Sequence, residues 1–357
     1  MFLFQKHYKR SMKILEYTDL TSPFFQPKVF LHIEKFKDIS EGRMPVPVTC
    51  EIDLTDGFCN NKCAHCFFST NTKDKPIYLE KETAKSLIQE LHQNGVKGIE
   101  FSGGGEPTTH PDFKEILSYA TNIGCSIGLI TNGLLLNKIM DVADKLSFVR
   151  ISLDAATPQV YEKVHGVPYF EKVIENIKEL TKNMNPLKIG VGYLIIENNI
   201  CDIVEAAKKI KQLGCRFLQY RPASLPYDTD SGIWEEAQRK IGDAKKYSDE
   251  NFQIFDAGVK WRHMNNDRCY SKCYTSSLVA VVKASGDIPV CILNRNNDSK
   301  IIGNVYEGGF FKNWYSERHK ELMSQIDVQS CRKPCKHDSY NIAYEAYQYG
   351  LYNKNFI

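Results

Sequence analysis

Short apolar runs alternate with longer amphipathic segments along the chain from about residue 46. Six runs rich in Val and Ile are typical of buried strands, and they lie at residues 46–54, 98–102, 126–131, 148–154, 188–195 and 216–220. In residues 79–94, Ala84, Leu87, Ile88 and Leu91 recur at the spacing of one helical face. The same spacing predicts helices at residues 141–146, 169–180 and 199–213.

Strands that alternate with helices predict right-handed βαβ units and therefore a parallel sheet in an α/β fold. Such a sheet either stays open and doubly wound or curls into a barrel. In both forms the loops that follow the carboxyl ends of the strands carry the functional site. We therefore look for chemistry directly after each predicted strand.

The pattern changes after Tyr220. Residues 221–267 are polar with one predicted helix at 233–249, and a strand pair is predicted at 277–283 and 287–293. A helix near 314–323 and a cysteine-bearing tail follow. We divide the chain into an N-terminal extension that packs on the main domain (1–45), a central α/β domain (46–225), and a linker with a C-terminal domain (226–357).

Composition narrows the class of protein. The 357 residues are 42% hydrophobic and 25% charged, as in ordinary globular proteins, and the formal net charge is only +3. This balance gives no support to a nucleic-acid or membrane-surface role. No apolar run is long enough to cross a bilayer, and the first residues do not have the pattern of a signal peptide. We expect a cytoplasmic protein.

Twelve cysteines are many for such a protein, and their spacing indicates metal sites. Three lie in one loop and five fall between Cys269 and Cys335, whereas a disulfide framework belongs to small secreted domains. Four further cysteines stand alone in or beside apolar stretches and are predicted to be buried packing residues: Cys50, Cys125, Cys201 and Cys215.

The first cysteine group directly follows the first predicted strand. Cys59, Cys63 and Cys66 form the pattern CxxxCxxC. Three thiolates can each bind one corner of a 4Fe–4S cubane, which leaves the fourth iron open for a ligand. The alternative is a zinc site, which usually takes four protein ligands with CxxC pairs. His65 would be the fourth ligand in that case, although it has little room between its neighbours.

CxxxCxxC after the first strand of a βα domain resembles the motif of the radical S-adenosylmethionine (radical SAM) superfamily. The resemblance implies a partial (β/α)6 TIM-like barrel. It also implies that the open iron chelates S-adenosylmethionine and that reductive cleavage yields a 5′-deoxyadenosyl radical. In this comparison His65 stands where the family usually has an aromatic residue beside the adenine.

Later strands carry residues that match the same resemblance. Gly104, Gly105 and Glu106 after the second strand match the motif that binds the methionine amino group. Asn132, Ser152 and Asp154 at the ends of the third and fourth strands are predicted cofactor contacts through hydrogen bonds to ribose or carboxylate. For Asn132 a simple turn before a helix is the alternative. No catalytic residue is assigned beyond the cluster ligands.

A second cysteine group lies near the C-terminus. Cys273, Cys291, Cys331 and Cys335 suffice for a complete four-thiolate site, with Cys269 and His337 as spare ligands. The arrangement resembles the SPASM/twitch auxiliary-cluster domains that follow many radical SAM barrels, here in the shorter form with one additional 4Fe–4S cluster. Four-coordinate zinc is the alternative for this group.

These features lead to a hypothesis of function with two alternatives. The first is oxidation or epimerisation of a small polar substrate such as a sugar or cyclitol, with a flavodoxin- or ferredoxin-type electron donor. The main alternative is modification of a ribosomal peptide or protein by epimerisation, thioether formation or oxidation. The alternative from another class is a non-catalytic metal-binding scaffold.

Overall fold

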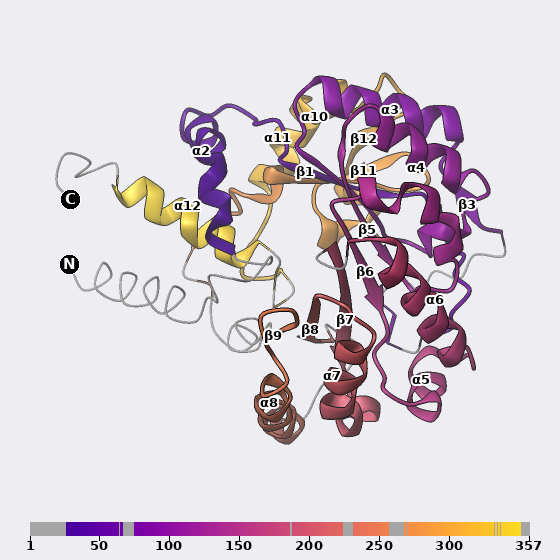
Figure 1. Ribbon diagram of the computed structural model, residues 1–357. Coiled ribbons are helices and arrows are strands. Elements are labelled where there is room, and N and C mark those ends of the chain that lie inside the picture. The colour runs from indigo at the N-terminus through magenta and orange to yellow at the C-terminus, as the bar shows by residue number, and fades with distance from the viewer. Residues whose placement is uncertain are drawn as a thin grey trace, which may run out of the picture.

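A computed structural model describes residues 26–63, 65–66, 75–185, 188–223, 231–256, 268, 270–331, 333, 335 and 337–350. Its centre is an eight-stranded parallel sheet in the order β10-β1-β4-β5-β6-β7-β8-β9 (Figure 1). The strands are β1 (Thr49–Asp53), β4 (Gly98–Ser102), β5 (Ser126–Thr131), β6 (Phe148–Ser152), β7 (Ile189–Ile195), β8 (Phe217–Pro222), β9 (Gln253–Asp256) and β10 (Val279–Val282). All six predicted strands are confirmed, and the architecture is an α/β partial barrel.

The predicted hairpin after residue 277 is wrong in its pairing. β10 pairs in parallel with β1, with Cys50 opposite Ala280, and so extends the main sheet. β11 (Asp287–Pro289) pairs instead with β12 (Ile301–Asn304) in a separate antiparallel ribbon. β10 consists of four consecutive apolar residues, all buried, which suits a parallel strand covered on both faces better than one arm of a half-exposed hairpin. The boundary proposed near residue 225 stays a prediction, and strands from both sides of it share one sheet.

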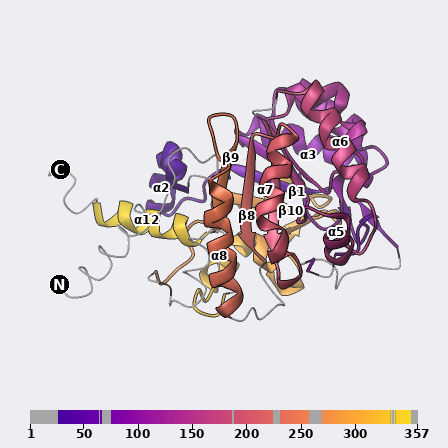
Figure 2. The ribbon, with the colours of Figure 1, turned by 60° about the horizontal axis from the view of Figure 1, so that its bottom comes forward.

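Helices cover the outer face of the sheet (Figure 2). They include α3 (Lys81–Gln93), α4 (Phe113–Asn122), α5 (Pro158–His165), α6 (Phe170–Asn183), α7 (Ile203–Gln212) and α8 (Ser231–Lys245). The apolar stripe predicted for residues 79–94 is buried, with Leu87 and Leu91 in the main core. Of the other predicted helices, the one at residues 141–146 is observed as the 3-10 helix Met140–Lys145.

The inner face of the sheet is set by the alternation of side chains along each strand. Phe148 lies over Gly128, because a Cβ added there would stand 2.4 Å from its ring. Phe217 lies over Gly190 in the same way, at 2.0 Å. The two aromatic rings therefore occupy the amino-terminal level of this face. The levels nearer the carboxyl ends of the strands carry mainly polar side chains.

The N-terminal and C-terminal helices lie side by side (Figure 1). Phe36 of α2 (Ile33–Ser40) is fully buried and meets Tyr344 of α12 (Asp338–Gly350) edge-on, with ring centroids 5.4 Å apart. Leu278 and Val279 belong to the same small apolar cluster. The described part of the N-terminal extension thus packs on α12 and on the β10 edge of the sheet.

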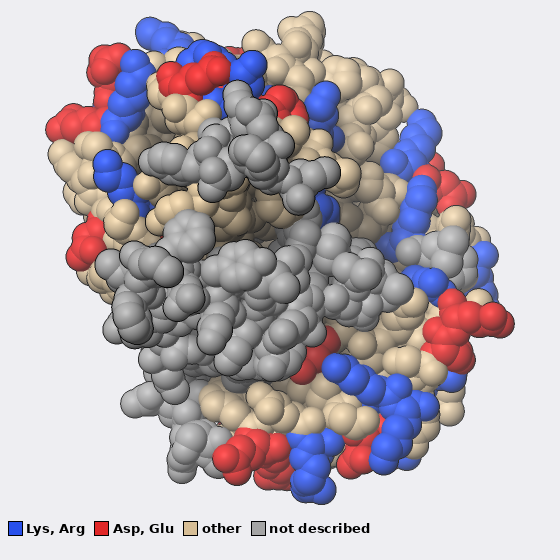
Figure 3. Space-filling model, turned by 90° about the vertical axis from the view of Figure 1, so that its left-hand side faces the viewer, with Lys and Arg blue, Asp and Glu red and all other residues tan. Residues whose placement is uncertain are grey.

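The surface is mixed in charge. On the described part of the face shown in Figure 3, basic and acidic side chains alternate around the rim and neither sign forms a continuous patch. This agrees with the small net charge. Within the described residues, none of the helices combines the length and the apolar character needed to span a membrane.

Candidate metal and cofactor sites

The first cysteine group lies in a loop at the carboxyl end of β1. The chain passes from β1 through Leu54 into β2 (Thr55–Asp56), which pairs with β3 (Ile77–Tyr78), and then enters the loop. Burial raises the pKa of Cys59 to about 11, and the nearby charges of Glu106 and Cys66 act in the same direction. Burial also raises the pKa of Cys63, and the charges of Asp154, Cys59 and Cys66 raise it further. The three predicted ligands are therefore close neighbours whose thiolates need a compensating cation.

The glycine-rich turn after β4 fits against this loop because it has no side chains. A Cβ on Gly105 would stand 2.1 Å from the carbonyl oxygen of Phe58, and one on Gly103 would stand 1.5 Å from Asp53 Oδ1. Gly103 also has a φ of +108°, which favours glycine. In addition, the Glu106 backbone N–H donates to Phe58 O at 3.1 Å. The turn thus shapes the space around Cys59.

Glu106 joins its own turn after β4 to the end of β5 at the base of this site. Its carboxylate accepts hydrogen bonds from Thr108 Oγ1 at 2.5 Å, Thr131 Oγ1 at 2.7 Å and the Asn132 backbone N–H at 2.7 Å. Burial raises its pKa, and these hydrogen bonds oppose the shift. Glu106 therefore fixes the turn after β5, while its predicted contact with a methionine amino group stays a prediction.

Asn132 is brought directly to the cysteine loop. Its side-chain amide donates to Asn60 Oδ1 at 2.5 Å and lies 3.8 Å from Cys59 Sγ. Asn132 therefore does more than form the turn that was its alternative interpretation. Its reach to the thiol fits a role beside a metal ligand.

Asp154 is held in a strained position between two histidines. It is buried with a φ of +53°, uncommon for a residue other than glycine. Its Oδ2 lies 3.6 Å from His65 Nε2 and 3.5 Å from His165 Nε2, and its Oδ1 accepts from the Leu194 N–H at 2.6 Å. Burial acts to raise the pKa of Asp154, but the hydrogen bond with His65 and the charge of His165 leave the pKa lowered. Strain of this kind is concentrated at functional sites.

His165 was not predicted, and it contacts a predicted metal ligand. Its Nδ1 lies 3.0 Å from Cys63 Sγ and 3.3 Å from Asn61 Nδ2, and its Nε2 lies 2.9 Å from the Leu153 carbonyl. Because a carbonyl only accepts, Nε2 carries the proton that faces Leu153. His165 ends α5, about a hundred residues after the cysteine loop, so no local pattern linked the two. Ser152 ends β6 on the same side, and its predicted role stays untested.

The second cysteine group is also brought together, from three separate segments. Burial raises the pKa values of Cys291, Cys331 and Cys335, to about 12 for Cys335, and the charges of neighbouring cysteines add to each shift. Three of the sulfurs accept hydrogen bonds. Asn294 Nδ2 donates to Cys291 at 3.1 Å, Asn341 Nδ2 to Cys273 at 3.6 Å and the His337 N–H to Cys335 at 3.4 Å. Such hydrogen bonds stabilise thiolate ligands.

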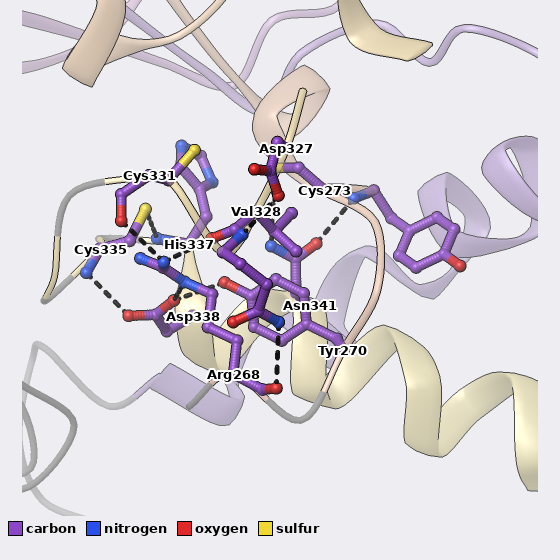
Figure 4. A network of polar contacts seen from close by, with 12 residues as sticks. Arg268, Tyr270, Cys273, Asp327, Val328, Cys331, Cys335, His337, Asp338 and Asn341 are labelled. Atoms are coloured by element: carbon purple, nitrogen blue, oxygen red, sulfur yellow. Dashed lines mark hydrogen bonds and ion pairs between the residues drawn. The ribbon is translucent and has the colours of Figure 1, made fainter. Parts of the chain in front are cut away.

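A buried network supports this group (Figure 4). Asp338 accepts from Arg268 Nε at 2.8 Å and from the Cys335 N–H at 2.7 Å, and it is also hydrogen-bonded by Tyr270. Arg268 donates in turn to the carbonyl oxygens of Val328 and Cys331, the latter at 2.8 Å. Asp338 and Arg268 therefore fix the backbone that carries two of the four thiols.

Of the two spare ligands predicted for the second cysteine group, the structure describes only His337. Cys269 lies outside the described residues, and His337 is buried at 1% exposure next to the group. Among the described residues, no three His, Cys, Asp or Glu side chains are arranged closely enough to hold a single metal ion. All seven cysteines singled out from the sequence stay predicted ligands. Their chemistry fits iron–sulfur clusters, because thiolates are the ligands that these clusters take.

A buried ion pair connects the two cysteine groups. Arg295 lies four residues after Cys291, and its Nη2 is 3.1 Å from Glu51 Oε1 and 3.0 Å from Asp53 Oδ2. Burial raises the pKa of Asp53 to about 7, although the charge of Arg295 opposes the shift. No local sequence pattern links Arg295 to Asp53, because the two are 242 positions apart.

Comparisons with known proteins agree with this geometry. Residues 55–235 match the family described as the radical SAM superfamily. The chain is 26% identical over 326 residues to mycofactocin maturase MftC of Mycobacterium tuberculosis, covering 86% of this chain and 79% of that protein. It is 29% identical over 184 residues to the antilisterial bacteriocin subtilosin biosynthesis protein AlbA of Bacillus subtilis, covering 50% of this chain and 40% of that protein. The fold resembles that of Streptococcus suis SuiB bound to its precursor peptide SuiA, with a TM-score of 0.65, 16% identity, and coverage of 89% of this chain and 74% of that one.

Proposed function

The chain belongs to the radical SAM superfamily, and from this premise we propose that it modifies a peptide substrate by abstracting a hydrogen atom from it. It is a radical SAM enzyme that uses S-adenosylmethionine and 4Fe–4S clusters. The observation that carries the proposal is the similarity to MftC, which extends over 86% of the chain and therefore into the C-terminal cysteine group.

The relatives favour the peptide alternative over the small polar substrate expected first. MftC is named a maturase, AlbA a bacteriocin biosynthesis protein, and SuiB was solved with a precursor peptide. None of these three names refers to a sugar or cyclitol. A cytoplasmic location and a flavodoxin- or ferredoxin-type electron donor remain parts of the proposal.

We assign the catalytic cluster to Cys59, Cys63 and Cys66. A 4Fe–4S cluster held by these three thiolates would supply the electron for reductive cleavage of S-adenosylmethionine, which is the chemistry that gives the hydrogen-abstracting radical. The residues of the chain position the reaction. The glycine turn lets the backbone approach the cofactor closely. Glu106 and Asp154, both buried, offer carboxylate oxygens beside the loop. Asn132 offers an amide and Ser152 a hydroxyl for further hydrogen bonds.

We assign a second cluster to Cys273, Cys291, Cys331 and Cys335. Its support is the convergence of these thiols from three segments and the hydrogen bonds that their sulfurs accept. Four thiolates leave no open iron, so this site suits electron transfer rather than substrate binding. The domain division near residue 225 belongs to the same proposal.

The test begins with anaerobic reconstitution. The wild-type protein should hold about eight irons with matching sulfide if both sites are 4Fe–4S. With dithionite and S-adenosylmethionine it should release 5′-deoxyadenosine, and Cys63→Ala should reduce the release to background. Cys125→Ala is the matched control, because burial raises the pKa of that thiol to about 11 but it lies before β5 at the far end of the strand. A wild-type protein that binds zinc and releases no 5′-deoxyadenosine would be the metal-binding scaffold instead.

The substrate class is tested separately. Peptides encoded by short reading frames beside the gene should stimulate 5′-deoxyadenosine release, and deuterium placed in the peptide should be transferred into it. A panel of sugars and cyclitols provides the comparison. Stimulation by a member of that panel and by none of the peptides would restore the small-substrate hypothesis.

A further inference from the structure

Charged side chains are distributed unevenly over the inner face of the sheet. Strand register places Glu51 of β1 directly opposite Glu100 of β4, so two carboxylates stand side by side on one part of the face. Arg150 belongs to β6 and Arg221 to β8, on the opposite side of β5. The inner face thus has two carboxylates on the side of β1 and β4, where Arg295 compensates Glu51, and two arginines on the side of β6 and β8.

The two guanidinium groups converge over a glycine of the strand between them. A Cβ on Gly192 of β7 would stand 3.1 Å from Arg221 Nη2 and 3.6 Å from Arg150 Nε. Both side chains therefore use the space that a larger residue at position 192 would fill. Arg150 Nη1 also donates to Gln219 Oε1 at 3.3 Å, which fixes its orientation.

Arg221 makes no close ion pair within the described part of the chain. No carboxylate there lies within 4.0 Å of its guanidinium, and its buried Nε has no hydrogen-bond acceptor. Burial lowers the pKa of Arg221 to about 9 and the charge of Arg150 contributes to the shift, whereas the charges of Asp154 and Glu100 oppose it. Arg221 is still protonated at neutral pH, so a partly buried cation stands beside a second cation. An anion placed between the two guanidinium groups would reduce their mutual repulsion and would accept the hydrogen bond that Arg221 Nε lacks.

We propose that Arg221, supported by Arg150, binds a carboxylate of the substrate on the inner face of the barrel. A planar guanidinium pairs with a carboxylate through two parallel hydrogen bonds, which makes this anion the best geometric match. This inference rests on the proposed function and narrows it to peptides that present an acidic side chain or a free C-terminus.

The location favours the substrate over the cofactor. Most predicted S-adenosylmethionine contacts lie in the loops that follow β1, β4, β5 and β6, whereas Arg221 comes from β8 and extends over Gly192 within the sheet. Ser152 is the one predicted contact at the same level, because it pairs in register with Gly192. The carboxylate of S-adenosylmethionine is therefore the competing occupant, and the experiment must separate the two.

The first arm uses acetate as the probe and acetamide as its uncharged counterpart. Reconstituted protein saturated with S-adenosylmethionine is titrated with each at constant ionic strength, and the unfolding temperature is followed. Acetate should stabilise the wild-type protein more than acetamide does. Arg221→Gln should weaken the acetate effect at least tenfold, Arg221→Lys should weaken it less, and Arg239→Gln on the outer helix α8 should leave it unchanged. Equal effects of acetate and acetamide on the wild type would overturn the proposal.

The second arm measures cofactor binding by equilibrium dialysis. Wild type and Arg221→Gln should bind S-adenosylmethionine within a factor of two of each other. A tenfold loss for S-adenosylmethionine but not for its decarboxylated analogue would assign the arginines to the cofactor and overturn the substrate assignment. If Arg221→Gln does not fold, Gly192→Ala replaces it, since its Cβ would stand 3.1 Å from Arg221 Nη2 and must shift the guanidinium by a few tenths of an ångström. Release of 5′-deoxyadenosine by the wild type is recorded in parallel, so a failure of the proposed function is seen independently of the acetate result.

Discussion

The guanidinium of Arg295 lies 3.0 Å from the carboxylate of Asp53, and this contact joins the two cysteine-bearing parts of the chain. Arg295 follows Cys291 in the second group, and Asp53 ends the strand that leads to Cys59. Both side chains are 2% exposed, so the pair is shielded from water. The loop of one proposed cluster is thereby fixed against the strand that positions the other.

Replacing Arg295 by Met should destabilise the protein strongly. The change leaves Asp53 and Glu51 buried without their cation, and breaking a buried pair on one side costs about 3–5 kcal/mol. Urea unfolding measures the loss. Adding Asp53→Asn to the variant should recover part of it, because one uncompensated charge is removed. Arg318→Met, at an exposed pair with Glu321, should change the free energy of unfolding by only about 0.5 kcal/mol.

Asp338→Asn should disable the second cysteine group while leaving the first intact. The substitution keeps the shape of the side chain but removes the charge that faces Arg268, whose side chain is 4% exposed. We expect about four irons per chain after reconstitution instead of about eight, counted together with sulfide. Glu317→Gln, whose side chain is 87% exposed, is the control and should retain the wild-type iron content. An unchanged count in Asp338→Asn would show that the network is not needed for cluster binding.

Much of the fold could be predicted because the signals were local. The strands of the barrel are apolar runs, and the predicted residues of the first site lie in the CxxxCxxC loop, in the glycine turn or at the ends of strands. The pairing of β10 with β1 could not be predicted, because residues 279–282 and 49–53 come together only when the barrel forms.

The supporting residues were missed for the same reason. His165 contacts Cys63 over a separation of 102 positions, and Asn341 contacts Cys273 over 68. A histidine at a helix end and an asparagine inside a helix are both ordinary in sequence. Only the folded chain shows that each one faces a thiol.

Gly105→Ala tests whether the glycine turn is required for its close approach to the cysteine loop. The new Cβ would stand 2.1 Å from Phe58 O, so the loop or the turn must move. We expect a loss of about 1–3 kcal/mol, as for other overpacked sites. The visible absorbance of the catalytic cluster should also decrease. Gly242→Ala is the control, since nothing lies within 4 Å of its Cβ and a helical alanine should stabilise by up to about 1 kcal/mol. Equal cluster absorbance in both variants would contradict this role.

His319 should make the protein less stable as the pH falls below 6.5. The side chain is fully buried, its Nδ1 donates to the Trp314 carbonyl at 2.7 Å, and burial lowers its pKa from 6.5 even though that hydrogen bond opposes the shift. Because the folded pKa is lower, the unfolded chain binds the proton first, and stability is lost on acidification. The loss can reach at most about 1.4 kcal/mol for each pH unit below 6.5.

His110 and His165 also have pKa values lowered by burial, so the contribution of His319 to the pH dependence is obtained as the difference between wild type and a His319 variant. Urea unfolding of wild type and His319→Asn between pH 7.5 and about pH 5 should give a shallower dependence for the variant, whose amide keeps a donor for Trp314 but does not titrate. As a control, a substitution at the exposed His92, His92→Asn, should keep the wild-type dependence of unfolding free energy on pH. The same pH dependence in wild type and His319→Asn would show that protonation of His319 does not destabilise the protein.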